Sequence, residues 1–364
     1  MCQDHALPTV LIMAGGTGGH VFPGLAVAQV LRERGYKVVW LGTRTGLEAR
    51  LVPEAGLRIE WLDVSGLRGK GLRSLLMAPL MLMRALRQAA AILRALRPGL
   101  AIGLGGFVSG PGGLMSWLLN VPLVVHEQNA VAGTTNRILA RFAKVVFEAF
   151  PASFGPSVPT LQVGNPVRRE IAAIAAPGER LAGRMCRPRV LVVGGSQGAR
   201  ALNETVPLAL ALLSEQKRPE VRHQTGASQF EATQSAYAAA GVDAQLAPFI
   251  ADMAAAYGWA DLVICRSGAL TVSELAAAGV GSVLVPFPYA VDDHQTANAA
   301  FLVDAGGAVL IPQDSLSAQS LAKCLGGLLG NRWRLEVMAE AARSVARIDA
   351  AERIVDEGLR YVRT

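Results

Sequence analysis

Short apolar runs alternate with amphipathic segments along most of the chain. "TVLIMA" is followed by "PGLAVAQVLRERG", "KVVWLG" by "TGLEARLVPEAG" and, in the second half, "PRVLVVGG" by "ALNETVPLALALL". The short runs of aliphatic and β-branched residues are typical of buried strands, and apolar residues spaced three to four positions apart are typical of one helix face. The alternation therefore predicts β-α-β units, with parallel sheets covered by helices on both faces.

The same plan occurs twice, in the same order. The first half contains "VLIMAGGTGGH", "LAIGLGGFVSGPGG" and "VPLVVHEQNA", and the second contains "VLVVGGSQGAR", "DLVICRSGALTVSE" and "SVLVPFPYAVDDHQTANA". Each segment is a strand followed by a glycine-rich or polar turn, so we predict two similar doubly wound α/β domains. A chain of 364 residues is also longer than one hydrophobic core usually serves.

The domain boundary is expected at "VGNPVRRE", because the residue before Pro166 is pushed out of helical geometry. This divides the chain into an N-terminal domain, 1–165, and a C-terminal domain, 166–347. The last segment, "AAERIVDEGLRYVR", has a helical pattern and could pack on either domain.

Composition narrows the class of protein. Hydrophobic residues make up 51% and charged residues 17% of the chain, but there is no uncharged apolar run of the length that spans a bilayer. The start, "MCQDHALP", lacks a positive region, so secretion is not expected. The four cysteines are far apart and form no C-x-x-C pair, which favours reduced thiols over a zinc site or a disulfide framework. We expect no metal and a cytoplasmic protein.

A net charge of +7 favours an anionic partner, and part of that charge is concentrated in "LRSLLMAPLMLMRALRQAAAILRALR", 72–97. At about 100° per residue its arginines form one stripe on a helix that Pro79 is expected to start or kink. No acidic residue occurs between Asp63 and Glu127. The alternative is a solvated helix face, but the apolar "LLMAPLMLM" and the missing carboxylate favour an anionic membrane surface. The stripe consists of Arg73, Arg84, Arg87, Arg94 and Arg97.

A nucleic acid is disfavoured as the partner. Aromatic residues make up only 5% of the chain, and no nucleic-acid recognition module is visible in the sequence.

The turn "GGTGGH" lets backbone N–H groups approach a phosphate or sugar at a helix start. The alternative is a tight turn with no binding role. A second glycine loop, "GGSQGAR", at the equivalent place in the repeat makes that alternative less favoured. Neither loop is a dinucleotide fingerprint, since a G-x-G-x-x-G frame from Gly16 puts Val21 at the third glycine. No G-K-[ST] follows either, so NAD binding and P-loop hydrolysis are disfavoured and no cofactor is expected.

Two side chains stand out at these turns. His20 ends the first glycine turn, where it could act as a general base or only as a structural hydrogen-bonding group. Glu274 lies on a helix predicted to begin near Ser267, where its carboxylate could accept hydrogen bonds from two ribose hydroxyls. An ordinary acid in the first turns of a helix is the alternative for Glu274.

Several motifs occurring in order resemble the MurG family, the bacterial transferases that add N-acetylglucosamine to lipid I. They include "GGTGGHVFPGLAVA", "RGKG", "GGFVSGPGG", "HEQNAVAGTTNR", "VGNPVR", "VLVVGGSQGARALN", "CRSGALTVSELAAAG" and "DDHQTANA". The resemblance implies a GT-B fold, two Rossmann-like domains facing a cleft, with the C-terminal helix, 348–364, crossing back to the first domain. It implies inverting transfer from UDP-N-acetylglucosamine to the muramoyl 4-hydroxyl of lipid I, giving lipid II, at the cytoplasmic face of the cell membrane.

The resemblance also implies a set of site residues. His20 is our choice for the catalytic base, and the first glycine turn would hold the acceptor's diphosphate or the sugar. Some family members have Gln-Gln where this chain has His294-Gln295, so His294 is left without a role. The donor contacts carried over are Thr17, Gly18, Gly19, Asn129, Arg168, Ser196, Ile250, Ala269, Leu270, Thr271, Val272, Ser273, Glu274 and Gln295. Arg73, Arg84, Arg87 and Arg94 would face the membrane or the acceptor.

Two other functions remain open at this stage. A UDP-N-acetylglucosamine 2-epimerase shares the two-domain architecture, although the basic apolar stretch argues against it. A membrane-docked protein that binds a UDP-sugar for another transferase is the non-enzymatic alternative.

Overall fold

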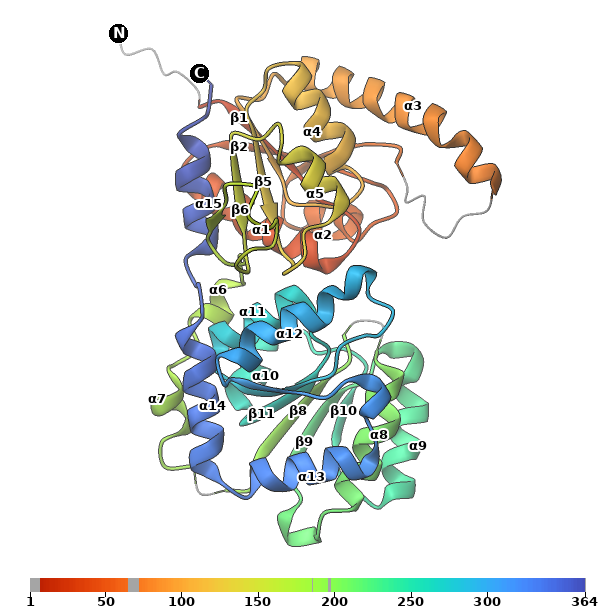
Figure 1. The fold of residues 1–364 in the computed structure, drawn as a ribbon, viewed down its shortest axis with the longest axis vertical. Helices are drawn as coiled ribbons and strands as arrows, with labels where there is room; N and C mark the ends of the chain where they lie inside the picture. The colour runs from red at the N-terminus through yellow and green to blue at the C-terminus, as the bar shows by residue number, and fades with distance from the viewer. Residues whose placement is uncertain (1–6, 65–71, 185, 196–197, 364) are drawn as a thin grey trace. The chain divides into compact units, whose positions relative to one another are not determined.

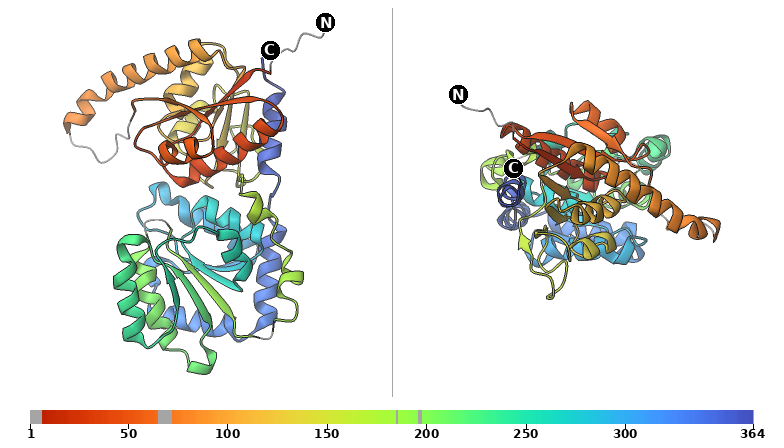
Figure 2. Two further views of the ribbon diagram at one scale, coloured as in Figure 1. Left: turned by 180° about the vertical axis from the view of Figure 1, so that it is seen from behind. Right: turned by 90° about the horizontal axis from the view of Figure 1, so that it is seen from above.

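The computed structural model describes residues 7–64, 72–184, 186–195 and 198–363. The chain divides into two compact units, Met1–Arg168 with Ile348–Thr364, and Arg169–Arg347 (Figure 1). Each unit is built on one sheet with helices on both faces (Figures 1 and 2). The prediction of two doubly wound α/β domains is therefore confirmed.

Within the described part of the first unit, the sheet has seven strands in the order β3-β2-β1-β4-β5-β6-β7. Every neighbouring pair is parallel. The strand order reverses between β1 and β4, and doubly wound sheets bind ligands beyond the carboxyl ends of the strands at such a point. The strands are β1 (Thr9–Met13), β2 (Lys37–Gly42), β3 (Arg58–Trp61), β4 (Leu100–Gly103), β5 (Leu123–Glu127), β6 (Val145–Glu148) and β7 (Leu161–Gln162).

Alternate residues of β1 pack into two separate hydrophobic clusters, one on each face of the sheet. Val10 and Ile12 pack in one buried cluster with residues of α1 and α15, whereas Leu11 and Met13 pack in another with residues of α3. This period of two is what a strand buried on both faces requires. The helices of the unit are α1 (Gly18–Glu33), α2 (Glu48–Glu54), α3 (Leu72–Leu96), α4 (Ser109–Leu118), α5 (Thr134–Leu139) and, from the end of the chain, α15 (Ala350–Leu359).

The second unit repeats the plan with six described parallel strands in the order β10-β9-β8-β11-β12-β13. Its order reverses between β8 and β11, the counterpart of β1 and β4. The strands are β8 (Arg189–Val193), β9 (Glu220–Gln224), β10 (Gln245–Ala247), β11 (Leu262–Cys265), β12 (Gly281–Leu284) and β13 (Ala308–Leu310).

Helices of the second unit cover both faces of this sheet, and its core includes Val190 and Val192 of β8 together with Leu202 and Val206 of α8. The α-helices are α6 (Arg169–Ala172), α7 (Pro177–Leu181), α8 (Arg200–Ala211), α9 (Phe230–Ala240), α10 (Met253–Trp259), α11 (Ala269–Ala278), α12 (His294–Asp304), α13 (Ala318–Leu329) and α14 (Arg332–Ser344). Short 3₁₀ turns lie at Glu215–Lys217, Ala227–Gln229, Val291–Asp293 and Gln313–Ser315.

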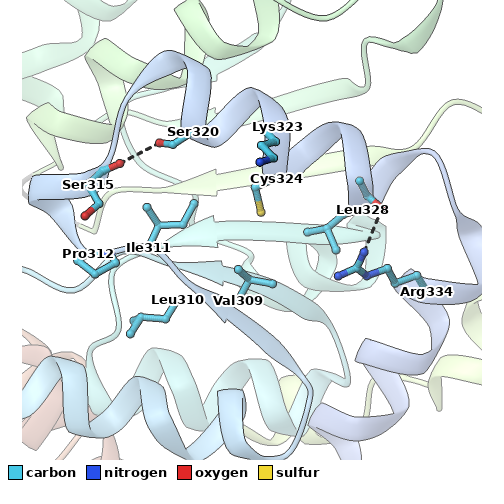
Figure 3. A pocket seen from close by; sticks show the side chains of 11 residues that line it. Val309, Leu310, Ile311, Pro312, Ser315, Ser320, Lys323, Cys324, Leu328 and Arg334 are labelled. Atoms are coloured by element: carbon cyan, nitrogen blue, oxygen red, sulfur yellow. Dashed lines mark hydrogen bonds between the residues drawn. The ribbon is translucent and has the colours of Figure 1, made fainter.

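A cavity of about 440 Å³ lies beside the edge strand β13 (Figure 3). Its wall is largely aliphatic, and Lys323, Cys324 and Arg334 from α13 and α14 complete it. Arg334 is turned toward the carbonyl of Gly327, and burial raises the pKa of the Cys324 thiol. None of the residues predicted to bind a ligand lines this cavity, so we do not place the functional site there.

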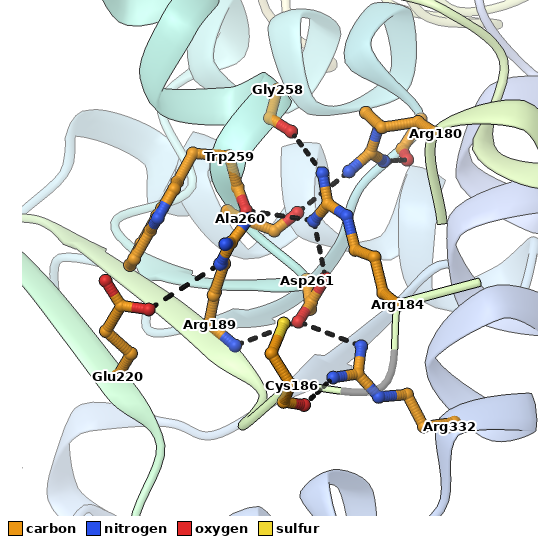
Figure 4. Close-up of polar contacts among 11 residues, drawn as sticks. Arg180, Arg184, Cys186, Arg189, Glu220, Gly258, Trp259, Ala260, Asp261 and Arg332 are labelled. Carbon is orange, nitrogen blue, oxygen red and sulfur yellow. Dashed lines mark hydrogen bonds and ion pairs between the residues drawn. The ribbon is translucent and has the colours of Figure 1, made fainter. Parts of the chain in front are cut away.

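A buried carboxylate organises the amino end of β11 (Figure 4). The Asp261 side chain is fully buried, and its Oδ1 accepts a hydrogen bond from Arg184 Nη1 at 2.8 Å. Its Oδ2 accepts from the Arg189 backbone N–H at 2.9 Å and from Arg332 Nη1 at 3.2 Å. One carboxylate thus joins the starts of β8, β11 and α14.

Candidate active site

The first glycine turn connects the end of β1 to α1. Thr17 is the N-cap residue of α1, with an extended backbone (φ −100°, ψ 162°) and no side-chain capping bond. The N–H groups of Gly18 and Gly19 begin the helix, where no carbonyl one turn earlier can pair with them. The structure thus places three of the predicted donor residues where N–H groups and a hydroxyl could bind an anion or a sugar.

His20 lies in the first turn of α1 and has two close neighbours. Its Nδ1 lies 2.9 Å from Gln128 Oε1, just beyond β5. Its ring also lies against the turn after β4, where Gly105 has φ +101° and an added Cβ would lie 2.7 Å from the imidazole. A side chain at residue 105 would displace the ring. The fold therefore fixes the His20 ring instead of leaving it to rotate.

Sequence reasoning missed Glu48, which lies beneath the same turn. Its buried carboxylate accepts hydrogen bonds from the Gly16 N–H at 2.9 Å and from the Thr43 N–H and hydroxyl at 2.9 and 2.7 Å. The Gly16 N–H is thus already paired and cannot serve a phosphate. In the sequence, Glu48 looks like an ordinary acid in the first turn of a helix.

The loop "HEQNAVAGTTN" after β5 is shaped by Glu127, which is 2% exposed. The Glu127 carboxylate accepts from the Asn129 backbone N–H at 2.9 Å, from the Gly133 N–H at 3.1 Å and from Asn136 Nδ2 at 2.9 Å. The backbone of Asn129, a predicted donor contact, is therefore fixed by its hydrogen bond to Glu127. Asn136 is a supporting residue that the sequence did not single out.

In the second unit, Arg266 and Gln295 both hold the loop between β12 and α12. Arg266 Nη1 donates to the carbonyls of Val285 and Pro286, both at 3.1 Å, and its guanidinium lies over the Phe287 ring. The Phe287 N–H donates to Gln295 Oε1 at 2.9 Å. This bond fixes the orientation of the Gln295 amide, whose NH₂ group could donate to a sugar hydroxyl.

Helix α11 starts directly after β11, at the point where the strand order reverses. The N–H groups of Leu270 and Thr271 in its first turn have no intrahelical partner by helix geometry and can bind an anion. Val272 is buried and its N–H bonds to the Gly268 carbonyl, so it supports the turn from within. The Ser273 hydroxyl donates to the Ala269 carbonyl at 3.0 Å.

Glu274 lies one turn further along α11 and is 6% exposed. Its Oε2 accepts a hydrogen bond from the hydroxyl of Tyr257, on α10, at 3.2 Å. Tyr257 is itself buried, and its place in an alanine-rich stretch gave no signal in the sequence. Burial raises the pKa of the neighbouring Cys265 thiol to about 12, which argues against a nucleophilic role for it.

The remaining predicted donor residues are scattered in the chain. The N–H of Ile250 donates to Gln224 Oε1 at 2.9 Å, so Gln224 positions that backbone and is another residue the sequence missed. The Arg168 guanidinium lies over the ring of Phe22, 5.6 Å from its centroid. Ser196 lies outside the described residues, as does the motif "RGKG".

The basic stretch forms α3, which begins at Leu72 and continues through Pro79. Pro79 therefore does not start the helix, and a kink there stays a prediction. The expectation that no carboxylate balances the arginines is corrected. Arg84 does have a carboxylate partner, since its Nη2 lies 3.0 Å from Asp63 Oδ2. A hydrogen bond from Gln88, together with Arg84, lowers the pKa of Asp63. Asp63 comes just before the segment without acidic residues, and it lies beside α3 only in the folded protein.

The other arginines of the stretch and the apolar side chains around α3 differ in exposure. Arg87 and Arg94 are exposed, whereas the side chain of Arg73 lies outside the described residues. Helix α3 packs on α4, and α4 packs on α5. Large exposed apolar side chains on these three helices are Leu80, Leu82, Met83, Trp117, Leu118 and Ile138. Across the part of the chain that the structure describes, no helix has the length and apolar character needed to span a bilayer.

The two Rossmann-like units, with glycine turns at their switch points, have the architecture of the GT-B glycosyltransferases, which confirms the predicted fold class. Family models described as the glycosyltransferase family 28 N-terminal domain and C-terminal domain match residues 10–148 and 189–354. Among the described residues there is no group of three or more histidine, cysteine, aspartate or glutamate side chains that could hold a metal ion.

Individual relatives narrow the class further. The chain is 57% identical over 346 residues, 95% of both chains, to the UDP-N-acetylglucosamine–N-acetylmuramyl-(pentapeptide) pyrophosphoryl-undecaprenol N-acetylglucosamine transferase of Marinobacter nauticus. It is 57% identical to the enzyme of the same name from Nitrosococcus oceani, covering 96% of this chain and 98% of that one. A crystal structure of Acinetobacter baumannii MurG matches with a TM-score of 0.84 and 43% identity, over 97% of this chain and 99% of that one. The chain belongs to the MurG family of N-acetylglucosamine transferases.

Proposed function

We propose that this protein transfers N-acetylglucosamine from UDP-N-acetylglucosamine to the 4-hydroxyl of the muramoyl sugar of lipid I, which yields lipid II for peptidoglycan synthesis. The observation that carries the proposal is the 57% identity, over 95% of both chains, to a relative named for this transfer. The acceptor oxygen attacks the anomeric carbon from the face opposite UDP. The carbon–oxygen bond to UDP then breaks, and UDP leaves with the electron pair.

The second unit supplies the donor side of the proposal. Glu274 would accept hydrogen bonds from the ribose hydroxyls, since its carboxylate is already oriented by Tyr257. The N–H groups of Leu270 and Thr271 in the first turn of α11, together with Ser196 in the second glycine loop, would stabilise the charge that develops on the diphosphate. The NH₂ group of Gln295 would donate to a hydroxyl of the transferred sugar, since the bond from the Phe287 N–H orients its amide.

The first unit supplies the acceptor side. His20 would take the proton of the attacking hydroxyl on the ring nitrogen that does not face Gln128. The N–H groups of Gly18 and Gly19 and the Thr17 hydroxyl would bind the diphosphate of the acceptor or the sugar that the donor supplies, in keeping with their place among the predicted donor contacts. The Gly16 N–H has no part in this, because Glu48 already holds it.

A turnover assay tests the reaction directly. The purified protein is incubated with UDP-N-acetylglucosamine and a lipid I analogue, and UDP release and the disaccharide product are measured. Formation of UDP-N-acetylmannosamine without an acceptor would indicate the epimerase instead. Binding of the UDP-sugar without any turnover would indicate the non-enzymatic alternative.

Glu274→Ala should weaken binding of UDP-N-acetylglucosamine by about 1.5–3 kcal/mol, because two ribose hydroxyls lose a charged acceptor. This corresponds to roughly 10- to 150-fold in the dissociation constant. Isothermal titration calorimetry measures the affinity directly. Glu204→Ala is the matched control, since Glu204 is an exposed carboxylate of the same unit that pairs with Arg200. An unchanged affinity in a folded Glu274→Ala protein would remove Glu274 from the donor site.

We propose that α3 and its neighbours attach the protein to the anionic cytoplasmic face of the cell membrane. Exposed apolar side chains lie on α3, which also carries the arginines, on α4, which packs against α3, and on α5, which packs against α4. In both side views the first turns of α3 extend beyond the rest of their unit (Figures 1 and 2). A surface that combines arginines with exposed leucine, methionine and tryptophan is typical of proteins that lie on a membrane without crossing it.

Replacing Arg84, Arg87 and Arg94 together by glutamine should reduce binding to anionic vesicles by about two orders of magnitude, because each basic residue near the surface contributes about 1 kcal/mol. Arg87 and Arg94 should contribute more than Arg84, which already pairs with Asp63. Vesicle sedimentation at two salt concentrations measures the effect, and wild-type binding should weaken as salt rises.

The matched control removes the same charge from the second unit by replacing Lys217, Lys323 and Arg347, all of them exposed. It should bind vesicles nearly as well as the wild type. Turnover of a short water-soluble acceptor should survive the change in α3. If vesicle binding were unaffected while that turnover collapsed, α3 would serve the fold or the acceptor, and membrane attachment through it would be refuted.

A further inference from the structure

Four groups of the first unit form one continuous line of hydrogen bonds. His20 Nδ1 lies 2.9 Å from Gln128 Oε1, and Gln128 Nε2 lies 3.0 Å from His126 Nδ1. His126 Nε2 lies 2.9 Å from the carbonyl oxygen of Gly164. His126 and Gln128 are 0% and 1% exposed, so water does not compete for these bonds.

The carbonyl of Gly164 determines which group donates and which accepts in each of these hydrogen bonds. A carbonyl oxygen can only accept, so His126 carries its proton on Nε2 and donates it to Gly164. Burial lowers the pKa of His126 to about 4, which keeps the ring neutral at pH 7 and leaves its Nδ1 as an acceptor. The NH₂ group of Gln128 must therefore face His126, and its second hydrogen has an acceptor in the His126 carbonyl, 3.4 Å away.

The orientation of the amide then determines the protonation of His20. With its NH₂ turned toward His126, Gln128 presents Oε1 to His20, and an amide oxygen can only accept. His20 must therefore donate from Nδ1, which places its lone pair on Nε2. The backbone of Gln128 is also fixed, because Asn165 Nδ2 donates to its carbonyl at 3.0 Å.

We infer that Gln128 and His126 are positioning residues that hold His20 in the Nδ1–H tautomer, so that Nε2 is available to remove the proton of the acceptor hydroxyl. The use of that lone pair rests on the proposed function, whereas the tautomer does not. A free imidazole populates both tautomers, and the hydrogen bond at one nitrogen decides which the protein selects. After proton transfer to Nε2, His20 still donates from Nδ1 to Gln128, so no other group in the line has to change its proton.

The tautomer can be read by NMR in the full-length protein. Selective ¹⁵N labelling of histidine gives signals from only five residues, and His20→Gln assigns that of His20 by its disappearance. We expect His20 Nδ1 to have the shift of a protonated ring nitrogen and Nε2 that of an unprotonated one. In Gln128→Leu we expect the two shifts to move toward each other, as in a mixture of tautomers. A wild-type spectrum with the proton on Nε2 would overturn the inference, as would an unchanged tautomer in Gln128→Leu.

Kinetics and conservative variants separate positioning from simple packing. Gln128→Leu should lower kcat by about 10- to 100-fold, less than complete loss of a general base, and leave the KM for UDP-N-acetylglucosamine unchanged. Gln128→Glu removes the donor toward His126 Nδ1 but retains an acceptor toward His20, so it should preserve the Nδ1–H tautomer of His20. Should Gln128→Leu not fold, Gln128→Met removes the amide at similar length, and the wild-type spectrum alone still decides the tautomer. A His20→Ala enzyme with full turnover would refute the proposed base and leave the tautomer assignment standing.

Discussion

Replacing His20 by alanine should lower kcat by about 10²–10⁴-fold, the contribution of a general base, and leave the affinity for UDP-N-acetylglucosamine nearly unchanged. The reason is geometric. His20 is seated against Gly105 and bonded through Nδ1 to Gln128, in the unit that does not contain Glu274 or α11. The alanine variant therefore loses the group that accepts the proton but keeps every residue that we assign to nucleotide binding.

Single-turnover measurements with a lipid I analogue, combined with calorimetry of the donor, separate the two effects. Gln29→Ala is the matched control, because Gln29 is exposed on the same helix and bonds only to Glu33 among the described residues. It should have wild-type kinetics. A loss of less than about threefold in the His20 variant would mean that another group, or water, takes the proton.

The fold follows from the sequence because the hydrophobic pattern is local and repeated. Each strand, the turn that follows it and the next helix lie within about thirty residues, the length of a β-α-β unit. The glycine turns after β1 and β8 and the polar turns after β5 and β11 can each be recognised within one such unit. In parallel sheets such turns collect at one edge, so His20 and Gln128 could be expected near each other without knowledge of their side-chain contacts.

The supporting residues could not be predicted in the same way. Glu48 accepts a hydrogen bond from the N–H of Gly16, 32 residues earlier. Gln224 accepts one from the N–H of Ile250, 26 residues later. Tyr257 donates one to the carboxylate of Glu274, 17 residues later. Each is an unremarkable residue in its own segment, and its role depends on a partner that only the tertiary structure supplies. The pairing of Asp63 with Arg84 is of the same kind. The ligand roles of the site residues stay predictions, which the variants described above test.

Asp261→Ala should cost the second unit about 3–5 kcal/mol of unfolding free energy, because it leaves the charges of two arginines in or near the interior without their carboxylate. The Asp261 side chain is fully buried, whereas those of Arg184 and Arg332 are 16% and 35% exposed. The Arg189 backbone N–H would also lose its acceptor (Figure 4). Urea unfolding followed by circular dichroism measures the loss.

Glu220→Ala is the matched control for this prediction, since Glu220 belongs to the same arginine-rich region and its carboxylate lies 3.6 Å from Arg189 Nε in a partly exposed pair. It should cost less than about 1 kcal/mol. A similar small loss for Asp261→Ala would mean that water replaces the carboxylate without penalty. Asp261 lies at the amino end of β11, while Arg266, Ser267 and the start of α11 follow its carboxyl end. Under conditions in which the variant stays folded, its affinity for the UDP-sugar should therefore match that of the wild type. The stabilising contacts of Asp261 and the proposed donor site lie at opposite ends of β11.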